Sequence, residues 1–189
     1  MAVNISQIKY KEGCILTIAE GIVGRKKTND KFDLYETQDW ATRLILNELL
    51  KDGVLHKGDT ISEVCSGAGA ISKILEEYGF DAVSSDIQTE DFIYGEKGVD
   101  VYNMPDKSHK IIFTNPPYNL MTKNNMLNEF LRISTDKVIL LLNIFFLSSK
   151  ERYELLKNKT PLKYIYIHSD RLTMFPYGEE KPKTTGTKM

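Results

Sequence analysis

The sequence predicts an α/β fold in which a doubly wound, mostly parallel sheet is covered by helices. Short apolar runs that end at turns alternate along the chain with stretches whose apolar residues recur at helical spacing. One run, over residues 137–146, is apolar on both faces, which is typical of a central parallel strand. In sheets of this kind a ligand binds at the carboxyl ends of the strands, so we expect the functional site there.

The elements are expected within residues 32–177, which form a single domain. The first helix begins with Thr37 as its N-cap and stops at Gly53, because a threonine hydroxyl can cap a helix and a glycine can end one. Residues 1–31 are an extension without a readable element, and residues 178–189 are a polar tail for which we expect disorder. Further helices are expected over residues 71–78, 124–133 and 149–156, and strands over residues 60–65, 81–85, 99–102, 110–114, 137–146 and 162–168.

The composition is that of an ordinary globular protein. The 189 residues carry a net charge of −1, whereas a nucleic-acid-binding protein usually has a basic excess, so a nucleic-acid substrate would require a local basic patch. The two cysteines, Cys14 and Cys65, form neither a metal-type spacing nor a disulfide framework. The sequence has no leader peptide and no apolar stretch of about 20 residues, so we expect a cytoplasmic protein without membrane or metal.

The most informative motif is Asn115-Pro116-Pro117-Tyr118, which follows the apolar run over residues 110–114. The amide oxygen of Asn115 and a main-chain carbonyl fixed by the prolines can accept the two N–H bonds of an exocyclic amine. The ring of Tyr118 can stack on the planar group that carries this amine. The pattern therefore indicates a site for a flat, amine-bearing substrate, although a Pro-Pro turn after a strand also occurs as a simple loop.

A small-residue loop between a strand and a helix forms the second motif. Gly67 and Gly69 allow a sharp turn and a close approach of the backbone to a ligand. Glu63 precedes this loop, and Asp86 ends the next expected strand, where a carboxylate can accept hydrogen bonds from ribose hydroxyls. The loop is not a dinucleotide fingerprint, because Ser72 stands where the third glycine would fall.

Together these motifs resemble class I S-adenosylmethionine-dependent methyltransferases of the N6-adenine type. Asn-Pro-Pro-Tyr is similar to their catalytic motif, and the acidic residue followed by small residues is similar to their first cofactor motif. The order of the elements resembles small DNA adenine methyltransferases of phage type over roughly residues 32–177. The element Tyr35-Glu36-Thr37-Gln38 is similar to the family's Tyr-x-Thr-Pro, with glutamine in place of the proline.

The resemblance implies S-adenosylmethionine as the cofactor and a Rossmann-like fold. Glu63 and the backbone of Gly67–Gly69 would hold the methionine part, Asp86 the ribose, and Asp100 the adenine amine of the cofactor. The catalytic residues implied are Asn115, Pro116, Pro117 and Tyr118. The cofactor-binding residues implied are Tyr35, Thr37, Glu63, Cys65, Ser66, Gly67, Gly69, Asp86 and Asp100.

The implied reaction is the transfer of a methyl group to the exocyclic N6 amine of adenine in DNA. Because this nitrogen is a poor nucleophile, acceptance of its protons by Asn115 and the Pro116 carbonyl would increase its electron density during a direct, in-line transfer. In duplex DNA the base would first be flipped out. Methylation of cytosine carbon 5 is disfavoured, because it needs a nucleophilic cysteine, commonly after a proline, and neither Cys14 nor Cys65 follows one.

Three alternatives stay open at this stage. The same motif occurs in enzymes that methylate RNA adenine or a glutamine amide of a protein, and the motif alone cannot separate these substrates. A catalytically inactive cofactor-binding or interaction module is an answer of another class. Members of the family finish the sheet with an antiparallel seventh strand, and no apolar run follows Tyr177, so that strand is either replaced or missing.

Overall fold

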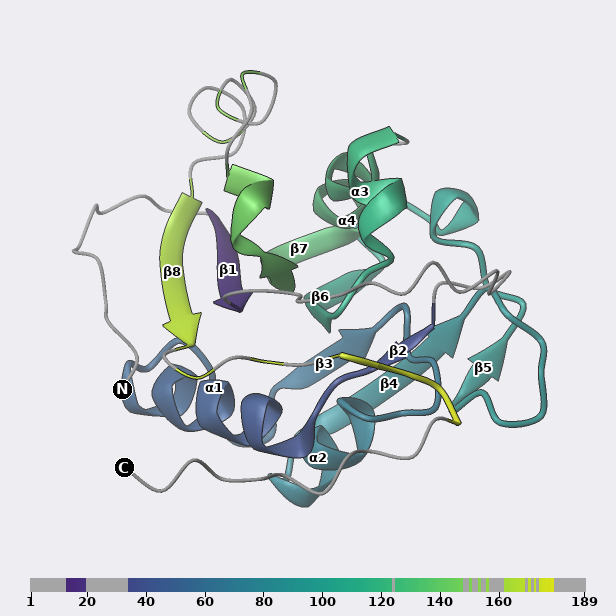
Figure 1. Ribbon diagram of the computed structural model, residues 1–189, viewed down its shortest axis with the longest axis horizontal. Coiled ribbons are helices and arrows are strands. Elements are labelled where there is room, and N and C mark those ends of the chain that lie inside the picture. Colours follow the sequence, from purple (N-terminus) through teal and green to yellow (C-terminus); the bar gives the residue numbers. More distant parts are fainter. Residues whose placement is uncertain are drawn as a thin grey trace.

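A parallel sheet forms the centre of the molecule (Figure 1). The computed structural model describes residues 13–19, 34–123, 125–147, 150, 153, 156, 162–168, 170, 172 and 174–178. The polar tail from residue 179 onward and most of the helix expected over residues 149–156 lie outside the described residues. Within the described residues, no helix has the length and apolar character needed to cross a membrane.

The sheet has the strand order β5-β4-β3-β6-β7-β1-β8, and every recorded pairing in it is parallel. From β3 the chain adds β4 and β5 toward one edge of the sheet. It then returns to the other side of β3, where it adds β6 and β7 toward the opposite edge. The predicted α/β fold with a mostly parallel sheet is therefore confirmed, with a switch of direction between β3 and β6. The strands are β1 (Gly13–Ala19), β3 (Thr60–Glu63), β4 (Asp81–Asp86), β5 (Glu96–Lys97), β6 (His109–Thr114), β7 (Ser134–Asn143) and β8 (Leu162–His168).

Strand β1 is an element that the sequence analysis missed. It lies between β7 and β8 and pairs in parallel with both, from Gly13 opposite Lys137 to Ala19 opposite His168. Figure 1 shows this purple strand next to β8 at one side of the sheet. The sheet therefore draws on residues before position 32, and no antiparallel strand takes part in it within the described part of the chain.

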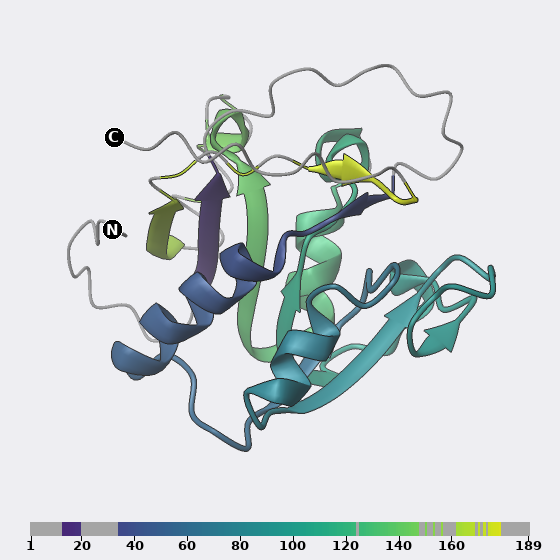
Figure 2. The same cartoon turned by 60° about the horizontal axis from the view of Figure 1, so that its bottom comes forward.

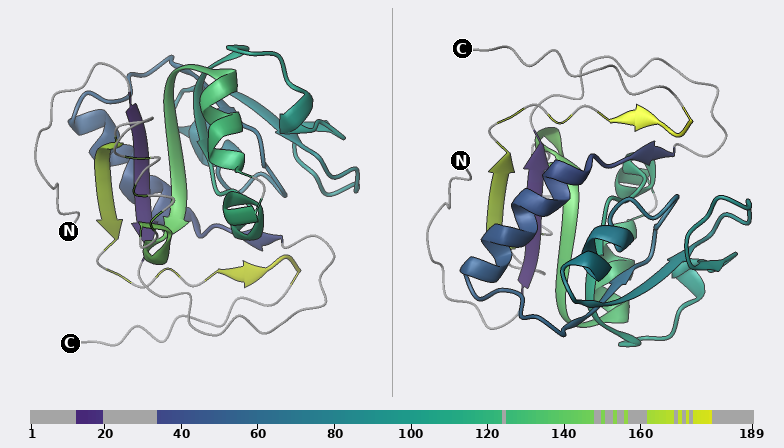
Figure 3. Two further views of the ribbon diagram at one scale, coloured as in Figure 1. Left: turned by 90° about the horizontal axis from the view of Figure 1, so that it is seen from above. Right: turned by 90° about the horizontal axis from the view of Figure 1, so that it is seen from below.

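Helices cover both faces of the sheet, as the two opposite views of Figure 3 show. Helices α1 (Asp39–Lys51) and α2 (Ser72–Glu77) pack on one face, and α3 (Tyr118–Lys123) and α4 (Met126–Ile133) on the other. Strand β6 serves both layers, because Ile111 and Phe113 point into the core below α1 and α2 while Ile112 points into the core below α4. Burial on both faces explains the continuous apolar run of this strand.

A small antiparallel ribbon lies across the carboxyl edge of the sheet. Strand β2 (Tyr35–Glu36) pairs with β9 (Phe175–Pro176), two segments that are far apart in the sequence (Figure 2). The N–H of Tyr177 donates to the carbonyl of Leu34 at 3.2 Å, and the Tyr177 ring stacks on Phe92 at 4.3 Å between centroids. The ribbon is thereby fixed to the loop that follows β4.

Two local predictions were wrong. The third strand is Glu96–Lys97, not residues 99–102, where the chain forms a 3-10 turn over Val101–Asn103 instead. The N-cap of α1 is Gln38 rather than Thr37, and no side chain caps this helix. Thr37 therefore precedes the helix and its hydroxyl is available to the site.

Candidate functional site

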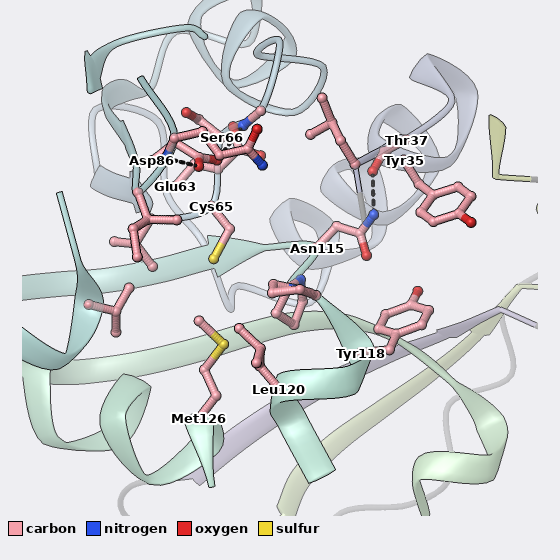
Figure 4. Close-up of a pocket in the computed structure, with 18 of the residues that line it drawn as sticks. Tyr35, Thr37, Glu63, Cys65, Ser66, Asp86, Asn115, Tyr118, Leu120 and Met126 are labelled. Carbon is pink, nitrogen blue, oxygen red and sulfur yellow. Dashed lines mark hydrogen bonds between the residues drawn. The ribbon is translucent and has the colours of Figure 1, made fainter. Parts of the chain in front are cut away.

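A cavity of about 330 Å³ opens at the carboxyl ends of β3, β4 and β6, where the direction of the chain switches (Figure 4). This volume lies at the lower end of the range typical of small-molecule sites. All the residues predicted for the site line it except Gly69. The predicted lining residues come from β2 and the turn after it, the glycine loop, the end of β4, the 3-10 turn and the Asn-Pro-Pro-Tyr segment.

The glycine loop brings bare backbone to the cavity. Gly67 has a φ of +50°, and a Cβ atom at this position would lie 2.7 Å from Cδ1 of Leu34. Its N–H donates to Oδ2 of Asp86 at 2.9 Å. A side chain at position 67 would therefore adopt a strained backbone conformation and displace the end of the Leu34 side chain.

Gly69 serves the packing of the loop rather than the cavity. Its φ is +81°, and an added Cβ would lie 2.5 Å from the ring of Tyr94. The hydroxyl of Tyr94 in turn donates to the carboxylate of Glu76 at 2.8 Å. The structure thus gives Gly69 a different task from the ligand contact that the sequence analysis expected.

Asp86 joins the two loops that border the cavity. Its side chain is buried; Oδ2 accepts the N–H of Gly67, and Oδ1 accepts the N–H of Gln88 at 2.9 Å. A carboxylate has further acceptor positions on both oxygens. Asp86 can therefore fix the loops and still accept a hydroxyl from a ligand.

Glu63 is buried at the end of β3 and binds the start of α2. Its Oε2 accepts the N–H of Ser72 at 2.7 Å and also the Ser72 hydroxyl, which in turn accepts from the hydroxyl of Ser84. Burial raises the pKa of Glu63 from its ordinary value to about 8, although the bonds from Ser72 act in the opposite direction. The Ser72 N–H in the first turn of α2 is already taken by this carboxyl group.

Asp100 and Cys65 have roles that the sequence did not specify. Oδ1 of Asp100 accepts the N–H of Tyr102 at 3.0 Å and so caps the 3-10 turn that stands where a strand was expected. Burial raises the pKa of the Cys65 thiol, so this side chain is neutral and unsuited to nucleophilic attack. Both residues line the cavity.

The Asn-Pro-Pro-Tyr segment connects β6 to α3. The Pro117 carbonyl accepts N–H bonds from Leu120 and Met121, so it belongs to the first turn of α3, which begins at Tyr118. Nδ2 of Asn115 donates to Oγ1 of Thr37 at 3.1 Å. Figure 4 shows the Asn115 oxygen directed away from Thr37, on the side of Tyr118.

Several lining residues were missed by the sequence analysis. Ile87 follows the carboxylate of Asp86 directly and could have been found as the apolar residue after an acidic strand end. The others reach the cavity through the ribbon and the residues next to it, through the 3-10 turn or through the start of α4, and their local sequence does not indicate this. The missed residues include Leu34, Glu36, Ile87, Tyr102, Met126 and Met174.

The charge of the cavity is one-sided. Besides Glu63, which its raised pKa keeps protonated near pH 7, three acidic residues line it, Glu36, Asp86 and Asp100, whereas its described lining contains no lysine, arginine or histidine. Such a lining favours a cationic or neutral ligand and disfavours a phosphate. Among the residues that the structure describes, no group of His, Cys, Asp or Glu side chains is arranged to hold a metal ion.

Comparison with known proteins adds no relative to this picture. No protein-family model matches the chain, and a search of curated proteins returned no match.

Proposed function

We propose that this protein transfers a methyl group from S-adenosylmethionine to the exocyclic N6 amine of adenine in DNA. The observation that carries the proposal is the meeting of two parts in one cavity: a carboxylate-lined glycine loop and the amide oxygen of Asn115. The first part suits a cationic nucleoside, and the second suits an amine. In our proposal the fold is accordingly the Rossmann-like fold of class I methyltransferases.

The charge of the cavity supports this cofactor over a dinucleotide. S-adenosylmethionine carries a sulfonium and an ammonium group but no phosphate, so a lining of carboxyl groups without a cation complements it. A dinucleotide places its pyrophosphate at the N-terminus of the helix after the glycine loop. In this chain the carboxyl group of Glu63 already accepts the Ser72 N–H at that position.

The residues that would hold the cofactor follow from their positions. The Gly67 backbone and Glu63 would bind the amino-acid part, Asp86 the ribose, and Asp100 with the apolar side chain of Ile87 the adenine. When bound, the cofactor supplies an activated methyl group on a positively charged sulfur.

The target amine would lie against Asn115. Its Oδ1 and the Pro116 carbonyl would accept the two N–H bonds of the amine and leave the nitrogen lone pair directed at the methyl carbon. Transfer would form a nitrogen–carbon bond as the carbon–sulfur bond breaks, with the bonding pair left on sulfur and the amine proton released to water. Tyr118 would stack on the ring that carries the amine.

A nucleobase suits the walls of the cavity better than a glutamine side chain does. Two flat side chains, Tyr35 from β2 and Tyr118 from α3, lie on the Asn115 side of the cavity (Figure 4). Aromatic faces stabilise a base by stacking, whereas an aliphatic amide gains little from them. This favours an adenine base over a protein glutamine, and we propose DNA rather than RNA because the sequence resembles DNA adenine methyltransferases. The experiment below distinguishes all three substrates.

The test first measures binding of the cofactor and then measures which substrate receives its methyl group. Calorimetry should detect binding of S-adenosylmethionine and no binding of NAD⁺ at the same concentration. The protein is then incubated with cofactor labelled in its methyl group and with separate pools of DNA, RNA and release-factor protein. Label on N6-methyladenine in the DNA pool supports the proposal; label in the protein pool alone would refute the DNA assignment.

Asn115→Ala should abolish most of this transfer and leave cofactor binding intact. Asn47→Ala is the matched control, since Asn47 lies on α1, accepts a bond from Tyr78 and does not line the cavity. Binding of the cofactor without transfer to any pool would favour an inactive cofactor-binding module.

A further inference from the structure

We infer that Thr37 is a positioning residue, whose hydroxyl fixes the amide of Asn115 with its oxygen toward the cavity. This inference rests on the proposed function for its catalytic meaning, but the hydrogen bond itself is independent of it. The sequence resemblance had implied only a cofactor contact for Thr37. The geometry points instead to the target side of the cavity.

The burial of Thr37 requires a partner for its hydroxyl. The residue is only 3% exposed, and a buried hydroxyl without a hydrogen bond is costly. The start of α1 does not use it, because the N-cap is Gln38, whose side chain accepts from Trp40 instead. The hydroxyl oxygen of Thr37 accepts the Nδ2–H of Asn115 at 3.1 Å.

The surroundings of the amide nitrogen determine which way the Asn115 side chain faces. Nδ2 lies 3.1 Å from Oγ1 of Thr37 and 4.0 Å from Sδ of Met174, and both of these atoms can accept a hydrogen bond. A reversed amide would place its oxygen against the lone pairs of the Met174 sulfur. The Thr37 hydroxyl could also donate to an amide oxygen, so it anchors the amide in either orientation. The Met174 sulfur can only accept, and it therefore favours the orientation in which nitrogen faces the protein and oxygen faces the cavity.

The fixed orientation gives the site a preference among flat ligands. An outward oxygen accepts from an amine, whereas an outward NH₂ group would donate to a ring carbonyl. Thr37, which anchors the amide, and Met174, which sets its direction, together favour an exocyclic amine over a carbonyl at the same ring position. They do so without contact to the reacting nitrogen, through an acceptor that is oriented before the substrate arrives.

The first experiment tests the hydrogen bond without any catalytic readout. Protein labelled with ¹⁵N-asparagine gives paired side-chain NH₂ signals, and Asn115→Ala identifies the pair of Asn115. In Thr37→Val this pair should shift upfield and exchange faster with water, whereas Thr37→Ser should keep the native shift. Thr42→Val is the matched control, since Thr42 is buried on α1 and its hydroxyl has no partner among the described residues. An unchanged Asn115 pair in Thr37→Val would overturn the inference.

The second experiment measures transfer with the full-length protein. Thr37→Val should lower kcat about 10- to 100-fold and leave the cofactor Kd within about threefold, because only the orientation of the acceptor is lost. Thr37→Ser should restore most of the rate. A weaker cofactor affinity with an unchanged kcat would assign Thr37 to the cofactor and refute its positioning role.

The two experiments also separate the inference from the proposed function. If the wild-type protein methylates no substrate pool, the proposed function fails, while the NMR shifts still decide whether Thr37 holds Asn115. Thermal melts check that the variants are folded. Should Thr37→Val not fold, Thr37→Ala provides the same loss of the hydroxyl with less bulk.

Discussion

The carboxyl group of Glu63 accepts the N–H of Ser72 at 2.7 Å and thereby ties the end of β3 to the first turn of α2. Both residues are buried, and the Ser72 hydroxyl donates to the same oxygen. The bond therefore fixes the start of α2, which follows the glycine loop. It also makes the stability of the loop depend on the protonation of one carboxyl group.

The first prediction concerns the effect of pH on stability. The folded-state pKa of Glu63, about 8, lies above its ordinary value, so its contribution to stability is full below about pH 4.5 and is lost as the pH rises through about 8. Glu63→Gln should remove this loss. The free energy of unfolding of Glu63→Gln relative to wild type should therefore rise by up to about 1.4 kcal/mol per pH unit between these pKa values.

Urea titrations at several pH values between about 5 and 9 measure this difference. All other residues are identical in the two proteins, so their contributions cancel in the comparison. A difference that stays constant with pH would show that Glu63 is ionised in the folded protein.

The second prediction concerns the acceptor role of residue 115. Asn115→Asp keeps an oxygen that can face the cavity, and Thr37 can then donate its hydroxyl proton instead of accepting. Single-turnover methyl transfer should therefore be fastest in wild type, slower in Asn115→Asp, and about 10²- to 10³-fold below wild type in Asn115→Ala. Equal rates for the two variants would exclude an acceptor function for the side chain.

The third prediction separates backbone strain from a clash in the glycine loop. Gly69→Ala introduces a Cβ at positive φ that would lie 2.5 Å from the ring of Tyr94. Gly53→Ala has a similar φ of +66° but no atom within 4 Å of its Cβ. Gly53→Ala should cost about 1 kcal/mol of unfolding free energy, and Gly69→Ala clearly more.

A double-mutant cycle tests the stated cause. In a Tyr94→Ala background the extra cost of Gly69→Ala over Gly53→Ala should fall but not vanish, because the Cβ of residue 94, 2.7 Å from the added Cβ, remains. If the extra cost is unchanged there, the Tyr94 ring is not what requires a glycine at position 69.

The fourth prediction uses the single tryptophan of the chain. Trp40 meets His168 edge-on, with 6.0 Å between the ring centroids. His168 is buried, and burial lowers its pKa below the ordinary value near 6.5. Its contribution to stability is therefore full above pH 6.5 and is lost as the pH falls through the pKa of His168 in the folded protein. The fluorescence of Trp40 should therefore decrease in wild type as the pH falls through the folded-state pKa of His168, and it should stay constant over the same pH range in His168→Gln. A matching drop in the variant would assign the quenching to another group.

The strand–helix alternation was predictable because burial on both faces leaves a continuous apolar run, as in β6 and β7. The third strand was placed wrongly because Glu96–Lys97 is a short, exposed edge strand that carries no such run. The lining residues of the motif loops were predictable from strand ends, since parallel strands bring these ends to one edge.

The ribbon and the contact of Thr37 were beyond sequence reasoning for a different reason. A threonine ahead of a helix has the same local pattern whether it caps the helix or bonds elsewhere, and its partner Asn115 is 78 residues away. Strand β1 was missed likewise, since its apolar residues become a strand only against β7 and β8. The ribbon, the Thr37 contact and β1 all depend on segments that are distant in the sequence, so the local sequence could not indicate them.

The position of β1 has a consequence for biosynthesis. The ribosome makes this strand before every other described strand of the sheet, yet both of its neighbours, β7 and β8, are made late. Until they emerge, Gly13–Ala19 has no partner for its backbone groups and must remain unpaired or bound by a chaperone. Pairings of such long sequence separation form slowly. We therefore expect β1 to join the sheet only after translation of β7, and β8 to complete the sheet by pairing with β1.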